Sequence, residues 1–155
     1  MLQQIDHVNI VVNDLSTMKE FYREVLGLTV TKEVTIAGEW IDRTVGLTGV
    51  EADVVYLDLE DGPRIELIRY RRPGGTAPTG SGIPNTTGLR HIAFRVDDLD
   101  ATIARLKLAG VKLFSEVQQV PDTQVTYAGG VRKRLVYFLD PESNILELCE
   151  YKTAE

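Results

Sequence analysis

The sequence of 155 residues contains a single cysteine, Cys149, and therefore can form no disulfide bond within the chain. We accordingly expect a reducing compartment, with the cytoplasm as the simplest location. No apolar run approaches the roughly 20 residues that cross a bilayer, so we expect no membrane partner. Basic residues are also in the minority, with 17 Lys and Arg against 23 Asp and Glu. This balance argues against a nucleic-acid partner, because phosphate binding needs a basic face.

What remains is the composition of an ordinary folded protein. Apolar residues make up 43% of the chain and charged residues only 26%, so a hydrophobic core can form and a disordered chain is not expected. The length suits one domain of common size, and we expect residues 1–155 to form a single domain.

The chain repeats itself. The segment "IDHVNIVVNDL" (5–15) aligns with "LRHIAFRVDDL" (89–99), which brings His7 onto His91. The segment "VVYLDLEDGPRIELIRY" (54–70) aligns with "LVYFLDPESNILELCEY" (135–151), which brings Glu66 onto Glu147. The sequence thus predicts two copies of one module, 1–70 and 89–155. The connector between them, 71–88, is rich in Pro, Gly, Thr and Ser, a composition typical of exposed linkers.

Hydrophobic periodicity predicts the order β-α-β-β-β in each module, and hence an α+β fold. Each begins with a strand, 5–12 in the first copy, followed by a helix with an Asp or Ser cap and a Gly stop. The further strands predicted in the first copy are 28–36, 53–59 and 64–70. Those predicted in the second are 111–119, 124–128, 133–139 and 145–151. Strands this short cannot bury a sheet face alone, so we expect the two modules to join in one curved structure.

Four polar residues recur at equivalent positions of the two modules: His7, Glu66, His91 and Glu147. The chain has only these two histidines. An unpaired carboxylate is costly to bury, so a glutamate in an aliphatic strand must be solvated, protonated or neutralised by a cation. Two imidazoles and two carboxylates together are a recurrent way to hold a divalent transition metal. The alternative is that duplication merely copied exposed residues.

The motifs "DHVNIVVNDLSTMKEFYREVLGL", "GLRHIAFRVDDLDATIARLKLAGV" and "YFLDPESNILELCE" resemble the vicinal oxygen chelate superfamily, which includes glyoxalase I, methylmalonyl-CoA epimerase, extradiol dioxygenases and antibiotic-resistance proteins. The resemblance covers nearly the whole chain. It implies a curved, eight-stranded mixed sheet, the glyoxalase-like cup, formed by tandem βαβββ modules. It also implies a divalent metal ion (Zn, Ni, Co, Mn or Fe) held by the positions of His7, Glu66, His91 and Glu147. We further expect a homodimer, because the sheets of such a cup and the connector leave apolar edges to cover, and the modules can pair within one chain or between two.

The activity that this resemblance implies is that of a lyase or isomerase of the glyoxalase or epimerase type. Such an enzyme removes a proton α to a metal-chelated carbonyl, from a small-molecule substrate with adjacent oxygens. The expected base is Glu147 or Glu66, and the sequence does not choose between them. One alternative is an Fe(II)-dependent extradiol-type dioxygenase using His7, His91 and Glu147, with Glu66 incidental. Another is a binding protein that sequesters an antibiotic without turnover.

Near the end of the second module, "GGVRKRLVYF" (129–138) gathers Arg132, Lys133 and Arg134. This basic run can be read as a solvated strand edge. It can also be read as an anchor for an anionic substrate, such as a carboxylate or a CoA phosphate.

Overall fold

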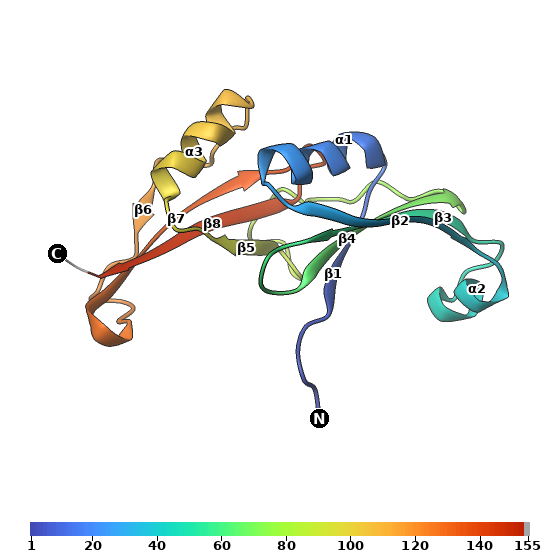
Figure 1. The fold of residues 1–155 in the computed structure, drawn as a ribbon, viewed down its shortest axis with the longest axis horizontal. Helices are drawn as coiled ribbons and strands as arrows, with labels where there is room; N and C mark the ends of the chain where they lie inside the picture. Colours follow the sequence, from blue (N-terminus) through green and yellow to red (C-terminus); the bar gives the residue numbers. More distant parts are fainter. Residues whose placement is uncertain (154–155) are drawn as a thin grey trace. The chain divides into compact units, whose positions relative to one another are not determined.

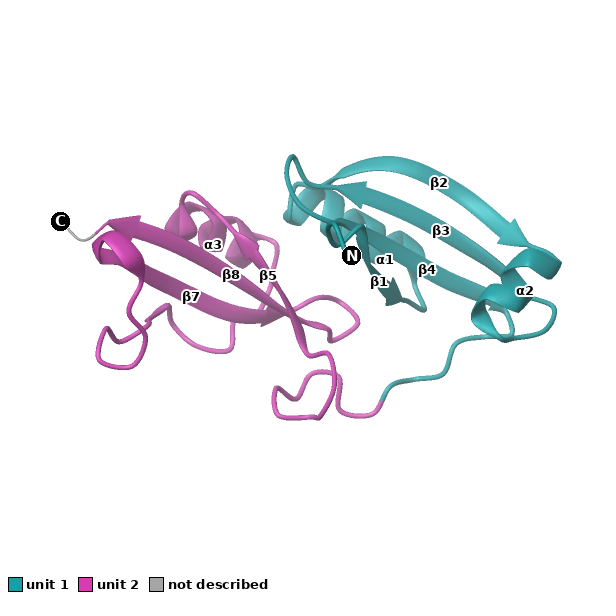
Figure 2. Ribbon diagram, turned by 90° about the horizontal axis from the view of Figure 1, so that it is seen from below, with its two compact units in different colours: residues 1–78 teal, residues 79–155 magenta. Residues whose placement is uncertain are grey.

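The computed structural model describes residues 1–153. The chain divides into two compact units, 1–78 and 79–155, and the boundary falls within the predicted connector 71–88 (Figure 2). Along the chain the elements are β1 (His7–Val11), α1 (Leu15–Glu20), the π-helical turn η1 (Phe21–Val25), β2 (Thr29–Ala37), α2 (Glu39–Val45), β3 (Glu51–Asp58), β4 (Arg64–Arg72), β5 (His91–Arg95), α3 (Leu99–Leu108), β6 (Gln118–Gln119), the 3-10 turn η2 (Ala128–Gly130), β7 (Val131–Leu139) and β8 (Ile145–Thr153).

The first unit is a four-stranded sheet in the order β1-β4-β3-β2, with α1 covering one face (Figure 1). β1 runs parallel to β4, and the other neighbouring strands are antiparallel. The helix begins where the sequence predicts, because the Asp14 carboxylate accepts a hydrogen bond from the Thr17 N–H at 3.0 Å. Its buried side chains, Met18, Phe21 and Tyr22, pack beneath it.

The second unit repeats this plan with the order β5-β8-β7-β6, and β5 runs parallel to β8. Asp98 caps α3 by accepting from the Ala101 N–H at 2.9 Å. Leu99, Ile103 and Leu106 form the buried stripe of that helix. The predicted α+β class and the duplicated βαβββ order are therefore confirmed.

Three local predictions need correction. The segment 39–45 forms a short helix, α2, which the sequence analysis did not predict. The predicted strand 111–119 is reduced to the two residues of β6, and 124–128 forms no strand. Pro121 interrupts this region, since its carbonyl accepts turn hydrogen bonds from Gln124 and Val125 instead of a ladder partner.

The candidate ligands lie on the sheet face opposite α1 in the first unit and opposite α3 in the second. In the first unit α2 covers part of this face, since its Ile41 packs against Val54 and Ile68. Backbone hydrogen bonding gives two four-stranded sheets, one in each unit. The joining of the two units in one eight-stranded sheet and one domain stays a prediction. No helix in residues 1–153 is long and apolar enough to cross a membrane.

Candidate metal site

The first candidate pair comes from the parallel strands β1 and β4. Asn9 is the register partner of Glu66, so their side chains share a face, and His7 joins them by the two-residue period of a strand. The Nε2 atom of His7 lies 3.4 Å from Oε2 of Glu66. The Asn9 amide donates to the same carboxylate oxygen at 3.0 Å. Strand register alone thus brings the predicted ligands together.

The orientation of the His7 ring is set by Asp6. A carboxylate can only accept, so Nδ1 of His7 donates to Oδ2 of Asp6 at 2.8 Å. This hydrogen bond is the main reason why the pKa of Asp6 is lowered. A neutral ring that is protonated on Nδ1 directs the lone pair of Nε2 toward Glu66. Two acceptors facing each other need a proton or a cation between them.

The second pair repeats the arrangement on β5 and β8. Ala93 is the register partner of Glu147, and His91, which lies two residues before Ala93, is on the same face of the sheet. The Nε2 atom of His91 is 3.3 Å from Oε2 of Glu147. The two pairs therefore agree in strand topology, in ring nitrogen and, within 0.1 Å, in spacing.

This spacing fits shared coordination of one cation. Ligand atoms bound about 2.0–2.2 Å from one ion lie about 3 Å apart at octahedral to tetrahedral angles. The glutamates are buried, with 8% of Glu66 and 3% of Glu147 exposed. The imidazoles above them keep 40% and 36% of their side-chain surface exposed. An ion can thus reach each pair from the solvent-exposed side of its histidine. Within residues 1–153 no three or more potential ligands are assembled into one cluster, so each unit supplies a pair.

A tyrosine on the adjacent antiparallel strand flanks each glutamate. Tyr56 is the register partner of Glu66, and Tyr137 is that of Glu147. A hydrogen bond to Glu66 is the main cause of the raised pKa of Tyr56. For Tyr137, burial raises the pKa most, and the charge of Glu147 adds to it. Both phenols therefore stay protonated and can act as donors at neutral pH.

A tight turn fixes the register of the β7–β8 hairpin that carries Glu147. The buried Asp140 accepts from the N–H groups of Glu142 and Asn144 at 3.0 and 2.9 Å. The Asn144 side chain also donates to it at 2.8 Å. This network holds the hairpin in the alignment that sets Tyr137 opposite Glu147.

The two pairs differ in their charged neighbours, which are Asp6 at His7 and Lys133 at Glu147. The Nζ atom of Lys133 lies 2.7 Å from Oε1 of Glu147. The two charges are paired, although this fully buried oxygen receives no well-aligned hydrogen bond from the described residues. Burial works to lower the pKa of Lys133, but the contact with Glu147 outweighs it and raises that pKa. In the first module the aligned residue is Ala52, and Glu66 instead has the neutral Asn9 amide.

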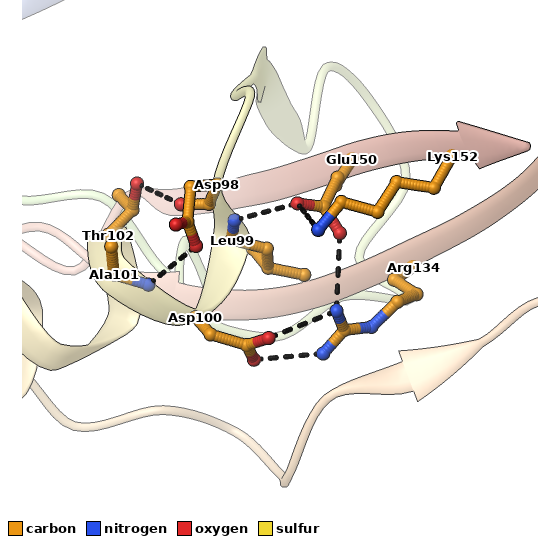
Figure 3. Close-up of polar contacts among 8 residues, drawn as sticks. All are labelled: Asp98, Leu99, Asp100, Ala101, Thr102, Arg134, Glu150 and Lys152. Atoms are coloured by element: carbon orange, nitrogen blue, oxygen red, sulfur yellow. Dashed lines mark hydrogen bonds and ion pairs between the residues drawn. The ribbon is translucent and has the colours of Figure 1, made fainter.

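A further buried carboxylate, Glu150, lies on the opposite face of β8 and has a structural role (Figure 3). It accepts from the Leu99 N–H at the start of α3 at 3.0 Å, and it pairs with Lys152 at 2.9 Å and Arg134 at 3.2 Å. Arg134 continues to Asp100 at 2.8 Å. Burial alone would raise the pKa of Glu150, yet the Leu99 N–H and Lys152 lower it. Its partners within the protein already satisfy this carboxylate.

Sequence reasoning identified both histidines and both glutamates but missed three of their neighbours. Asn9 could have been found, since the two-residue period of a strand places it on the same face as His7. Asp6 gave no signal, because adjacent strand residues ordinarily point to opposite faces. Lys133 was one of three consecutive basic residues, and only the structure separates it from the other two.

Comparison with known proteins agrees with this fold. The model of the Glyoxalase/Bleomycin resistance protein/Dioxygenase superfamily matches residues 4–148. The chain is 34% identical to the uncharacterised protein YaeR of Escherichia coli, over 96% of this chain and 97% of that protein. It is 30% identical to 2-epi-5-epi-valiolone epimerase of an Actinomyces species, over 93% of this chain and 77% of that enzyme.

Among solved structures, a glyoxalase family protein from Bacillus cereus matches with a TM-score of 0.80 and 31% identity, over 97% of this chain and 95% of the other. The duplicated βαβββ order, the equivalent His/Glu pairs and a family match across nearly all of the sequence lead to one conclusion: the chain belongs to the glyoxalase/bleomycin resistance/dioxygenase superfamily.

Proposed function

We propose that this protein is a divalent-metal-dependent lyase or isomerase that removes a proton α to a carbonyl group. The four proposed ligands are His7 and Glu66 from the first unit and His91 and Glu147 from the second. The observation that carries the proposal is the matched spacing of the two pairs, 3.4 and 3.3 Å between imidazole nitrogen and carboxylate oxygen. The Asp6 contact supports it, because proteins commonly orient a metal-binding histidine through a carboxylate at its other nitrogen.

The metal, when bound, would polarise the carbonyl oxygen of the substrate and so acidify the adjacent C–H bond. The protein must then accept the proton. We assign this role to Glu66, because its partners Asn9 and Tyr56 are neutral, whereas the Lys133 ammonium occupies one oxygen of Glu147. The C–H electron pair moves toward the carbonyl oxygen, and the proton passes to the Glu66 carboxylate. Return of this proton from Glu66 to the neighbouring carbon isomerises the substrate. Protonation of the original carbon from its opposite face by solvent water inverts its configuration, and Glu66 then releases its proton to solvent.

The relatives favour isomerase chemistry over the two alternatives. One curated relative is named as an epimerase at 30% identity. A dioxygenase site of His7, His91 and Glu147 would leave Glu66 incidental, yet Glu66 is buried and paired with its histidine just as Glu147 is. An antibiotic-sequestering protein needs no buried carboxylates beneath two imidazoles. Homodimer formation stays a prediction.

The experiment that tests the proposal is α-proton exchange in heavy water, followed by NMR with a panel of α-hydroxy ketones, 2-substituted acyl thioesters and hemithioacetals. The zinc-loaded protein is expected to exchange the α-proton of at least one class. Glu66→Gln at full zinc occupancy should slow that exchange by about 10²–10⁴. The exposed Glu60 on the same unit provides the matched control, and Glu60→Gln should exchange at the wild-type rate. Exchange at equal rates in the two variants would refute the assignment of Glu66.

A further inference from the structure

The three basic residues of the run 132–134 have different partners. Arg132 pairs with the exposed Asp122 at 3.3 Å, and Arg134 pairs with Asp100 and the buried Glu150. Lys133 alone reaches the face that carries His91 and Glu147, with its ammonium 2.7 Å from Glu147. Alternation along β7 sends neighbouring side chains to opposite faces, so one residue of the run is available to the candidate site.

A second cation shares the aromatic neighbour of Lys133, Tyr151. The guanidinium carbon of Arg95 is 5.3 Å from the centre of the Tyr151 ring, and Nζ of Lys133 is 5.8 Å from the same centre. Tyr127 packs edge-on against Tyr151, with ring centres 5.4 Å apart. Arg95 is exposed, and in residues 1–153 no carboxylate lies within ion-pairing distance of its guanidinium. Two cations thus flank the Tyr151 ring, and one of them, Lys133, also contacts Glu147.

In the first module two other cations, Lys32 and Arg64, lie 6.0 and 5.5 Å from the centre of the Tyr56 ring, but neither occupies a position equivalent to Lys133 or Arg95. Val11 aligns with Arg95, and Ala52 aligns with Lys133. Lys133 and Arg95 are therefore no requirement of the βαβββ fold, which forms in the first unit without cations at these positions. What distinguishes the second module is that one of its cations, Lys133, contacts the candidate glutamate directly, whereas Glu66 has the neutral Asn9 amide.

The balance of charge shows what such a face would bind. With a neutral imidazole, Glu147, Lys133 and Arg95 together carry one net positive charge, and a divalent ion at Glu147 raises this to three. The ion and the ammonium would then compete for one carboxylate. A ligand anion between Lys133 and Arg95 would relieve that repulsion and give both donors a partner.

We infer that Lys133 and Arg95 form an anion subsite beside Glu147, which binds a carboxylate or phosphate group of the substrate. This inference rests on the proposed function, since it places the subsite next to the metal ligand. It narrows the substrate class to carbonyl compounds that carry a separate anionic group. Tyr151 and Tyr127 would form the wall against which that group or its carbon chain packs.

The test is calorimetric titration of the zinc-loaded protein with inorganic phosphate and, separately, with acetate at constant ionic strength. We expect at least one of the two probes to bind. Tighter binding of phosphate than of acetate would indicate a phosphorylated substrate, and tighter binding of acetate would indicate a substrate that carries a carboxylate. Lys133→Met, which keeps the apolar stem, and Arg95→Gln should each weaken binding about tenfold or more. Arg132→Ala on the same strand should stay within about twofold of wild type, because its ion pair is exposed.

Zinc affinity separates this inference from the proposed function. Lys133→Met should bind zinc at least as tightly as wild type, because the competing ammonium is gone, and a misfolded variant would not do so. If zinc binds but neither probe does, or if both variants bind the anion as wild type does, the subsite is refuted and the metal site stands. If the wild-type protein binds no zinc, the proposed function falls and the subsite with it.

Discussion

Replacing Glu150 tests how the second unit holds helix α3 against its sheet. The side chain is 2% exposed, and its carboxylate joins the first helical N–H, that of Leu99, to Lys152 and Arg134. In Glu150→Ala the Leu99 N–H loses its buried partner, which costs about 1–3 kcal/mol, and the charge-assisted contacts are lost as well. Arg134 keeps Asp100 and the half-exposed Lys152 regains water, so the total should stay at about 2–4 kcal/mol.

Glu150→Gln separates shape from charge. The amide oxygen can still accept from Leu99, so the free energy of unfolding should fall by only about 1–2 kcal/mol. Because the pKa of Glu150 in the folded protein is lowered from its ordinary value of 4.5, the charge stabilises the fold above that pH. This contribution is lost as the pH falls through the folded-state pKa. The difference in the free energy of unfolding between wild type and Glu150→Gln should therefore be largest at neutral pH and should disappear in acid.

The assay is urea unfolding followed by far-UV circular dichroism at a series of pH values, with Arg132→Ala as the exposed control. That control should change the free energy of unfolding by less than about 0.5 kcal/mol. The proposed role of Glu150 would be refuted if Glu150→Ala were as stable as the control. It would also be refuted if the difference in unfolding free energy between wild type and Glu150→Gln increased in acid.

Two further predictions concern the ring partner of His7 and the packing of α3. Asp6→Asn should weaken zinc binding, measured by calorimetry, about 10–100-fold, because the hydrogen bond that orients the His7 ring is weakened. The control Asp122→Asn, at an exposed position, should bind zinc as wild type does. Equal zinc affinities of the two variants would argue against the role of Asp6. Leu106→Ala should lower the free energy of unfolding by about 2–5 kcal/mol, because Leu106 is fully buried. Leu108 is 89% exposed, so Leu108→Ala should lower it by less than about 0.5 kcal/mol. Similar urea midpoints for the two variants would contradict the described packing of α3.

The sequence was most informative where the two modules repeat each other. Apolar periodicity and the Asp caps predicted α1 and α3, and the alignment of His7 with His91 and of Glu66 with Glu147 selected the candidate ligands. What the sequence could not provide was the register of β1 against β4 and of β5 against β8. A shift of one residue would turn the histidine and the glutamate to opposite faces, so the pairing distance required a structure.

The missed elements have local causes. α2 is only seven residues long and lies between Gly38 and Gly46, whose positive φ angles end the flanking segments. Its sequence offers too few apolar positions to give a helical period. The predicted strand 124–128 contains Val125 and Tyr127, which favour strands, but Pro121 begins a turn that prevents pairing. Partners of charged groups, such as Lys133 on Glu147, depend on side-chain reach that periodicity does not describe.

In the proposed function, the two His/Glu pairs bind one ion together. This shared binding is tested most directly by zinc titration of the metal-free protein, with the bound metal counted by elemental analysis, in wild type, His7→Ala and His91→Ala. We expect about one ion per chain, and a loss of zinc affinity of about a hundredfold or more in either variant. Two ions per chain, with one retained at full affinity in each variant, would mean that the pairs bind separately and would contradict the proposal, as would the absence of zinc binding in the wild type.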